Sequence, residues 1–280
     1  MYTVMIVGPG YVGSALARSF KEKKQRVIVL GRSKEKLKSL EQEGIQTIQA
    51  DLREDKSIPS IPPAHFIIFS IAPDSRSEKD YRETYLLAVQ NFLNSIQKNP
   101  RPFLMVYLSS TGVYGEAVEG KIDEETPVIP DSERSSILKQ AEDQLLNSGF
   151  PCTILRLAGI YGPGRNRISM IQKQDWPDTI ENRYLNLIHR DDIVQMMPEF
   201  LNRAEAGKIY LGVDDELVLS KTFYEWLCQR LNLPFPAARF KDGKSKGKQY
   251  NNARLKSLGI QFKFPSYREG YLALTESTDS

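Results

Sequence analysis

Three glycines near the start of the chain have the spacing of a phosphate-binding turn. Apolar residues from Val4 to Val7 lead directly into Gly8–Gly13, which has the pattern G-x-G-x-x-G. In such a turn Gly8 permits a tight bend, Gly10 leaves room for a pyrophosphate, and Gly13 lets the next helix pack closely on the strand. The spacing therefore predicts that this turn binds the diphosphate of a dinucleotide.

The helix that follows this turn would complete the site. Tyr11 and Val12 lie at its predicted N-terminus, and Ser14–Ala17 continue the helical pattern. Free backbone N–H groups and the positive end of the helix dipole attract phosphate at such a terminus. A G-x-G-x-x-G alone is weak evidence, but between a strand and a periodic helix it is strong.

The residues after the second apolar segment indicate which dinucleotide would bind. In a site selective for NAD, an acid at the end of this strand accepts hydrogen bonds from the ribose hydroxyls. Here Gly31 is followed by Arg32, Ser33 and Lys34, which suit the 2′-phosphate of NADP better. We predict NADP as the cofactor, with NAD less favoured. The alternative is that Arg32 and Lys34 only form the polar first turn of a helix.

Two further segments are expected along the dinucleotide. Asp51 and Leu52 follow the third strand-like segment and are placed to meet the adenine edge. Ile71, Ala72 and Pro73 follow the fourth and should line the middle of the dinucleotide. The carboxyl ends of parallel strands are where such ligands bind.

Strands and helices must alternate to position these residues. Segments that predict strands are 26–30, 45–50, 66–71, 103–108 and 154–157, and segments that predict helices are 34–43, 81–96 and 137–146. The strand segments are apolar throughout rather than at every second residue, which indicates a parallel sheet covered on both faces. We predict an α/β fold of the Rossmann type, with a doubly wound parallel sheet.

From Gly162 onward the pattern is looser. Residues 209–213 predict one more strand, 220–231 a helix, and the capping-box spacing of Ser266 and Glu269 starts a last helix. We predict an NAD(P)-binding Rossmann domain over 1–161, to which 189–213 returns. Residues 162–188 and 214–280 would form a small C-terminal lobe that binds the substrate.

Composition argues against several classes of protein. A hydrophobic content of 40%, a charged content of 26% and a net charge of +3 give no reason to expect nucleic-acid or membrane partners. The basic stretch 239–248 is interpreted as a solvated loop. Cys152 and Cys228 form no metal-binding or disulfide pattern, so no metal is predicted. With a core strand at the N-terminus and no long apolar run, we expect a cytoplasmic protein acting on a small molecule.

Four motifs resemble one family in type and order. They are Gly8–Gly13, Leu108–Gly115, Arg156–Gly164 and His189–Ile193. Together they resemble the extended short-chain dehydrogenase/reductases, and most closely their atypical, NAD(P)-dependent epimerase/dehydratase-like branch. That branch also has segments similar to Pro130–Arg134 and Pro265–Gly270. The resemblance covers most of the chain, and family members often form homodimers through helices that flank the sheet.

The resemblance implies a proton relay in which one member is missing. Ser110 matches the family's serine, which hydrogen-bonds the substrate oxygen, and Lys139 matches the lysine that holds the nicotinamide ribose. The family's tyrosine, four residues before that lysine, is replaced by Ser135, and Tyr85 takes the place of the family's helix asparagine. An aliphatic hydroxyl cannot be brought into the pKa range of a tyrosine, whose reference value is about 10.

Three explanations stay open. Tyr114, Tyr161 or His189 could supply the proton, or Ser110 could act through water. The protein could instead bind NADP(H) without turnover, as a sensor or regulator. The third explanation is a reaction that needs no strong acid at that point. The function expected from the sequence is NADP-dependent redox or epimerase/dehydratase-type chemistry at a carbonyl or hydroxyl group, for example of a sugar derivative.

Overall fold

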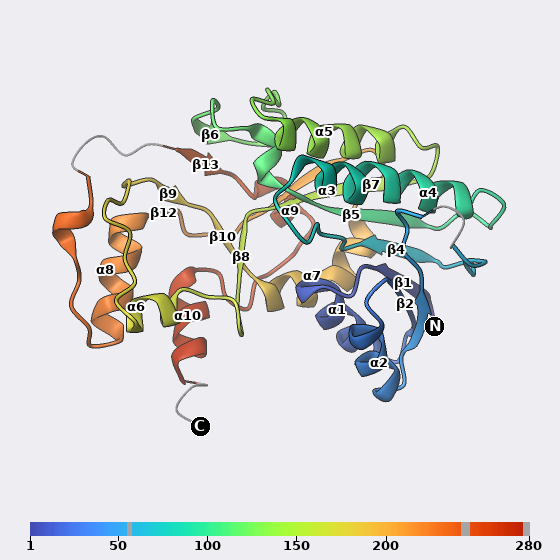
Figure 1. Cartoon of the computed structure of the whole chain (residues 1–280), viewed down its shortest axis with the longest axis horizontal. Helices are drawn as coiled ribbons and strands as arrows, with labels where there is room; N and C mark the ends of the chain where they lie inside the picture. Colours follow the sequence, from blue (N-terminus) through green and yellow to red (C-terminus); the bar gives the residue numbers. More distant parts are fainter. Residues whose placement is uncertain (55–57, 242–246, 277–280) are drawn as a thin grey trace.

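A seven-stranded parallel sheet forms the centre of the molecule (Figure 1). The computed structural model describes residues 1–54, 58–241 and 247–276. The strands are β1 (Thr3–Val7), β2 (Arg26–Gly31), β3 (Gln46–Gln49), β4 (Phe66–Phe69), β5 (Leu104–Ser110), β7 (Cys152–Leu157) and β11 (Ile209–Gly212). Their order is β11-β7-β5-β4-β1-β2-β3, and all neighbours pair in parallel. The predicted doubly wound sheet is confirmed.

Helices cover both faces of the sheet (Figure 1). One face carries α1 (Tyr11–Glu22), α2 (Lys34–Gln42) and α7 (Arg190–Arg203); the other carries α3 (Glu78–Arg82), η2 (Glu83–Leu87), α4 (Ala88–Ser95) and α5 (Glu133–Leu146). Within β1, Val4 and Ile6 belong to one buried core, and Met5 and Val7 to the other. Successive strand side chains point to opposite faces, which explains why the strands are apolar throughout.

A second, smaller group of elements lies beside the sheet, at the left of Figure 1. It contains β8 (Gly159–Tyr161), α6 (Ile168–Gln172), β9 (Tyr184–Leu185), β10 (Leu187–His189), β12 (Val218–Leu219), α8 (Ser220–Arg230), η4 (Ala237–Arg239) and α10 (Tyr267–Glu276). Its core is rich in aromatic side chains, among them Trp176, Phe223 and Tyr271. Ser266 and Glu269 cap the start of α10 as the spacing predicted, with one difference: Glu269 accepts the Ser266 N–H, but Ser266 Oγ accepts the N–H of Arg268 rather than that of Glu269, at 3.1 Å each.

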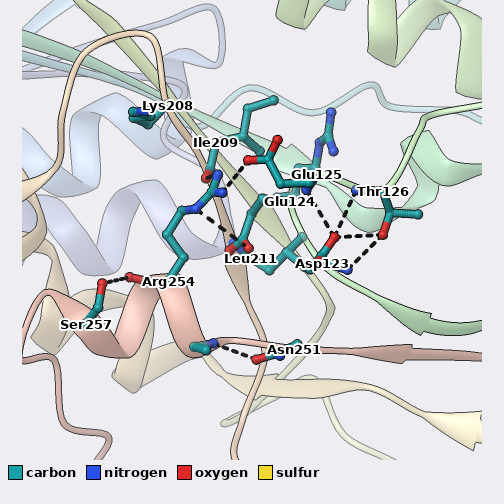
Figure 2. A network of polar contacts seen from close by, with 12 residues as sticks. Asp123, Glu124, Glu125, Thr126, Lys208, Ile209, Leu211, Asn251, Arg254 and Ser257 are labelled. Atoms are coloured by element: carbon teal, nitrogen blue, oxygen red, sulfur yellow. Dashed lines mark hydrogen bonds and ion pairs between the residues drawn. The ribbon is translucent and has the colours of Figure 1, made fainter.

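The free edge of β11 is covered by side chains from two distant segments (Figure 2). Glu124 Oε1 accepts the backbone N–H of Leu211 at 3.0 Å, and Arg254 Nη1 donates to the Ile209 carbonyl at 3.1 Å. Arg254 also pairs with Glu125. Unpaired backbone groups at a sheet edge invite pairing with other chains. This network satisfies two of them and ties α9 (Ala253–Ser257) and the segment after β6 (Gly120–Ile122) to the sheet. Strand β13 (Lys248–Tyr250) pairs with β6, and the Tyr250 hydroxyl donates to the Thr111 carbonyl of η3 (Thr111–Tyr114).

Two helices differ from the sequence prediction. The helix expected at 137–146 already begins at Glu133, because Ser132 and Ser135 form a reciprocal capping box there. The helix expected at 81–96 begins at Glu78 and contains the π-helical turn Glu83–Leu87. Residues 242–246 of the basic stretch lie outside the described residues. Across the described part of the chain, no helix is both long and apolar enough to cross a bilayer.

Candidate functional site

A cavity of about 670 Å³ opens where the strand order reverses, between β1 and β4. Ligands of doubly wound sheets bind at this switch point, beyond the carboxyl ends of the strands. Most of the residues predicted to bind the cofactor line this cavity: Gly8, Gly10, Tyr11, Arg32, Ser33, Asp51, Leu52, Ile71, Ala72 and Pro73. Val12 and Gly13 do not line it and are buried in α1.

The three glycines of the turn have different surroundings. Gly8 has a φ of 104°, and a Cβ there would lie 2.7 Å from the Ser70 carbonyl oxygen. A Cβ on Gly13 would lie 2.0 Å from the Gly8 carbonyl oxygen, so α1 packs directly on the turn. A Cβ on Gly10 would meet only the Ser70 oxygen, at 3.8 Å. The backbone is therefore closed behind Gly8 and Gly13 and open beside Gly10.

The N-terminus of α1 is free to receive an anion. Among the described residues, no side chain caps this helix, and its first turn contains no acid. The first helical hydrogen bond runs from Ser14 N–H to the Gly10 carbonyl, so the preceding amides have no acceptor within the helix. Unsatisfied amides at a helix N-terminus bind phosphate. The open backbone and the free amides both fit a dinucleotide diphosphate.

Charged side chains gather at the end of the cavity formed by β2 and β3. Arg32 pairs with Asp74 of the loop after β4. Arg53 donates from Nε to Asp51 Oδ1 at 2.9 Å and from Nη2 to Oδ2 at 2.5 Å. Hydrogen bonds from Arg53 hold the pKa of Asp51 below its usual value. The ammonium on the cavity wall is that of Lys36.

Sequence reasoning missed part of this charged group. It named Lys34, which does not line the cavity, and it omitted Lys36, Arg53 and Asp74, which do. Lys36 follows Arg32 by four residues, and Arg53 follows Asp51 by two. These short spacings could have indicated both cations. Asp74 carries no comparable signal, because only the tertiary fold brings its loop to Arg32.

Ser110 and Lys139 lie outside the cavity lining. Ser110 ends β5, and its Oγ accepts the Gly112 N–H at 3.0 Å. A Cβ on Gly112 would lie 3.3 Å from that Oγ and 3.8 Å from Leu138, so Ser110 is close to the α5 turn that carries Lys139. Lys139 Nζ itself donates to Asp143 at 2.5 Å.

Ser135 is a helix cap in this structure. Its side chain is buried, with 2% of the residue exposed. Ser135 Oγ accepts the backbone N–H of Asp131 and of Ser132 at 3.2 and 3.1 Å and donates to the Ser132 carbonyl at 2.9 Å. With these contacts, the hydroxyl at the family's tyrosine position stabilises the start of α5 and does not face the cavity.

The three side chains considered as substitute acids are all buried. Tyr114 is fully buried; its hydroxyl donates to the Asp123 carbonyl at 2.8 Å. Tyr161 stacks on Tyr271 with ring centroids 4.9 Å apart. His189 caps α7, because its Nδ1 accepts the Asp191 N–H at 3.1 Å. Burial raises the pKa of both phenols and lowers that of His189 to about 4.

A buried ion pair connects α5 to the sheet beside Ser110. Arg156 donates from Nε and Nη2 to Glu142, at 3.0 Å to Oε1 and 2.7 Å to Oε2. Ser109 Oγ donates to the same carboxylate at 2.6 Å, and Arg156 Nη1 donates to the Tyr114 hydroxyl at 2.8 Å. Neither Arg156 nor Glu142 is more than 2% exposed. The pair therefore holds α5 at a set position relative to the end of β5.

The fold and the cavity define a dinucleotide-binding α/β protein. The sequence profile of the NAD dependent epimerase/dehydratase family matches residues 4–211. The chain therefore belongs to this family, as the resemblance predicted. No curated protein matches the chain.

Solved structures extend the similarity to the full length. A Methylobacillus flagellatus protein named for the NAD-dependent epimerase/dehydratases is 29% identical, with a TM-score of 0.84 over 100% of this chain and 99% of that one. UDP-glucuronic acid 4-epimerase from Bacillus cereus, in complex with NAD, is 17% identical, with a TM-score of 0.77 over 96% and 95%. RMD from Pseudomonas aeruginosa, complexed with NADPH, is 17% identical, with a TM-score of 0.75 over 96% of each chain.

Proposed function

We propose that this protein binds NADP(H) in the cavity at the switch point and uses it in redox or epimerase/dehydratase-type chemistry. The substrate would be a small molecule with a carbonyl or hydroxyl group, for example a sugar derivative. The observation that supports this most is the agreement between the predicted cofactor residues and the lining of one cavity over an uncapped helix N-terminus.

Different residues of the cavity would contact different parts of the cofactor. The amides of Tyr11 and Val12 would bind the diphosphate, with Gly10 leaving room for it. Asp51 and Leu52 would meet the adenosine. Ile71, Ala72 and Pro73 would lie along the middle. When bound, the nicotinamide exchanges hydride with the substrate.

Ser110 is the residue proposed to contact the substrate oxygen. Its Oγ accepts the Gly112 N–H, which leaves the O–H free to donate. A hydrogen bond aimed at an oxygen that gains negative charge during hydride transfer stabilises the transition state. The resemblance assigns Lys139 to the nicotinamide ribose. In this structure its ammonium donates a hydrogen bond to Asp143.

The preference for NADP rests on the charge near the end of β2. Arg32, Ser33 and Lys36 line the cavity there, and the strand ends without an acid. Ser33 caps α2 by accepting the Lys36 N–H at 3.4 Å, so the start of that helix also faces this corner. The similar solved structures include four that hold NAD and one that holds NADPH.

Replacing Arg32 by alanine tests this preference. We expect Arg32→Ala to weaken NADPH binding about 10- to 100-fold, which is the effect of losing hydrogen bonds to a charged group. NADH binding should change less than about threefold, since NADH has no 2′-phosphate. Fluorescence titration with both nucleotides measures the ratio, and Lys34→Ala, off the cavity wall, is the matched control. Equal losses for both nucleotides would show that Arg32 does not read the phosphate.

A second function is favoured by a specific observation. Ser135 is engaged as a helix cap, and Tyr114, Tyr161 and His189 are buried. With these four candidates engaged or enclosed, the protein could bind NADP(H) as a sensor or regulator. Incubation with NADPH carrying deuterium at the transferred position, and with a carbonyl library, distinguishes the two functions. Transfer of label supports the enzyme, whereas tight binding with no transfer to any carbonyl supports the regulator.

The resemblance to the family also leads us to propose that the protein forms a homodimer. The outer surface of α3, η2, α4 and α5 carries Arg82, Leu87, Gln90, Gln140 and Gln144 around a shallow groove. Leu87 is 43% exposed there. A measured mass in solution by light scattering would give the oligomeric state directly.

A further inference from the structure

An ion pair joins two walls of the cavity. Arg32 follows β2 and Asp74 belongs to the loop after β4, and both line the cavity. Strands β2 and β4 are the two neighbours of β1, whose end carries the glycine turn. Two strands separated by one neighbour lie about 10 Å apart. The pair therefore links the loops on either side of the turn that would bind the diphosphate.

The loop that carries Asp74 is held in place from its far side. Asp80, in the first turn of α3, accepts the Ser75 N–H at 2.6 Å. Ser77 caps the same helix by accepting the Asp80 N–H at 3.2 Å. These bonds involve Ser75, Ser77 and Asp80 and do not use the carboxylate of Asp74, which pairs with Arg32. The side chain of Asp74 is 72% exposed, against 31% for Arg32.

Among the described residues, the other charged side chains of this corner do not form an ion pair with Arg32. Arg53 is engaged with Asp51 in a two-pronged contact. Lys36 is on the wall, and within the part of the chain that the structure describes it pairs with no carboxylate. An anion that approaches Arg32 therefore meets the negative charge of Asp74 at the same guanidinium.

We propose that Asp74 is a specificity-determining residue that competes with the 2′-phosphate of NADP(H) for Arg32. This inference rests on the proposed function, which assigns that phosphate to Arg32. A phosphate that binds Arg32 must displace or approach a carboxylate, so Asp74 lowers the affinity for the phosphorylated nucleotide. NADH presents only ribose hydroxyls and meets no such repulsion. Asp74 thus reduces the preference for NADP(H) over NAD(H) that Arg32 provides.

The test removes the charge of Asp74 and keeps its shape. For Asp74→Asn we expect NADPH to bind about three- to tenfold more tightly and NADH to change less than about twofold, as for a charge contact near the surface. The adenosine fragments 2′,5′-ADP and 5′-ADP should repeat this difference in calorimetric titrations. The difference should shrink at high salt, because salt screens exposed charges. Asp178→Asn, at an exposed aspartate of the second group of elements, is the matched control.

A double variant separates competition at Arg32 from a general effect of charge. In the Arg32→Ala background, Asp74→Asn should leave the NADPH affinity nearly unchanged, because the shared guanidinium is gone. A full gain in that background would overturn the proposal. So would an Asp74→Asn protein that binds NADPH and NADH in the wild-type ratio. Thermal melting of each variant confirms that it is folded.

The outcomes distinguish this inference from the proposed function. A wild-type protein that binds neither nucleotide would overturn both. A wild-type protein that binds NADPH, with a ratio that Asp74→Asn leaves unchanged, would overturn only the role of Asp74. If the wild type binds NADH better and Asp74→Asn reverses the order, the NADP preference fails while the competition at Arg32 stands.

Discussion

Arg156→Met is expected to lower the free energy of unfolding by about 3–5 kcal/mol, the usual effect of removing one partner of a buried ion pair. The methionine would leave Glu142, of which 1% is exposed, without its cation in the core. The Tyr114 hydroxyl would also lose its donor, Arg156 Nη1. Urea unfolding followed by circular dichroism measures the change.

A double replacement provides the control for this prediction. In Glu142→Leu/Arg156→Met both charges are gone, and buried ion pairs replaced by apolar residues are often neutral in stability. The double variant should therefore recover most of the stability that Arg156→Met loses. If the single variant is as stable as the wild type, or the double variant as unstable as the single, then burial of an unpaired charge is not the cause.

Two alanine replacements in the glycine turn should separate folding from binding. A Cβ on Gly13 would lie 2.0 Å from the Gly8 carbonyl oxygen, so Gly13→Ala forces α1 away from the turn. We expect it to cost about 1–3 kcal/mol of stability or more, as overpacking does, and to abolish nucleotide binding. Thermal melting and NADPH titration measure the two effects.

Gly10→Ala is the matched variant. Its Cβ would have only one neighbour, at 3.8 Å, and Gly10 has a φ of −84°, which alanine adopts freely. Stability should stay within about 0.5 kcal/mol of the wild type, as for most replacements in open space. NADPH binding should fall at least about tenfold, since the methyl group takes the space of the diphosphate. Undiminished binding to Gly10→Ala would contradict the placement of the diphosphate.

The central sheet could be predicted because its signals are local. The apolar strand segments between helical ones require two covered faces, and Gly8–Gly13 requires a strand before it and a helix after it. The capping box at Ser266 was also readable. The start of α5 at Glu133 was not predicted, because its signal is a capping box in which a serine, Ser135, takes the N3 position that usually holds Glu or Gln.

The sequence pattern could not reveal which side chains share a site when they come from different loops. Arg32 and Asp74 are brought together because β2 and β4 both flank β1. The order of strands in a sheet cannot be predicted from a local sequence pattern. The same holds for Tyr114, which follows β5 closely in the sequence but is buried against Arg156 in the fold. Burial depends on all neighbours at once.

By itself, the order of residues determined the parallel sheet, the glycine turn and the cations that follow β2, since each depends on conformational preferences within a few neighbouring positions. Only the tertiary structure decided which charges meet across the cavity, that Ser135 caps a helix, and that the candidate acids are enclosed. Those contacts join segments far apart in the chain, and the free energy of packing the whole molecule selects them.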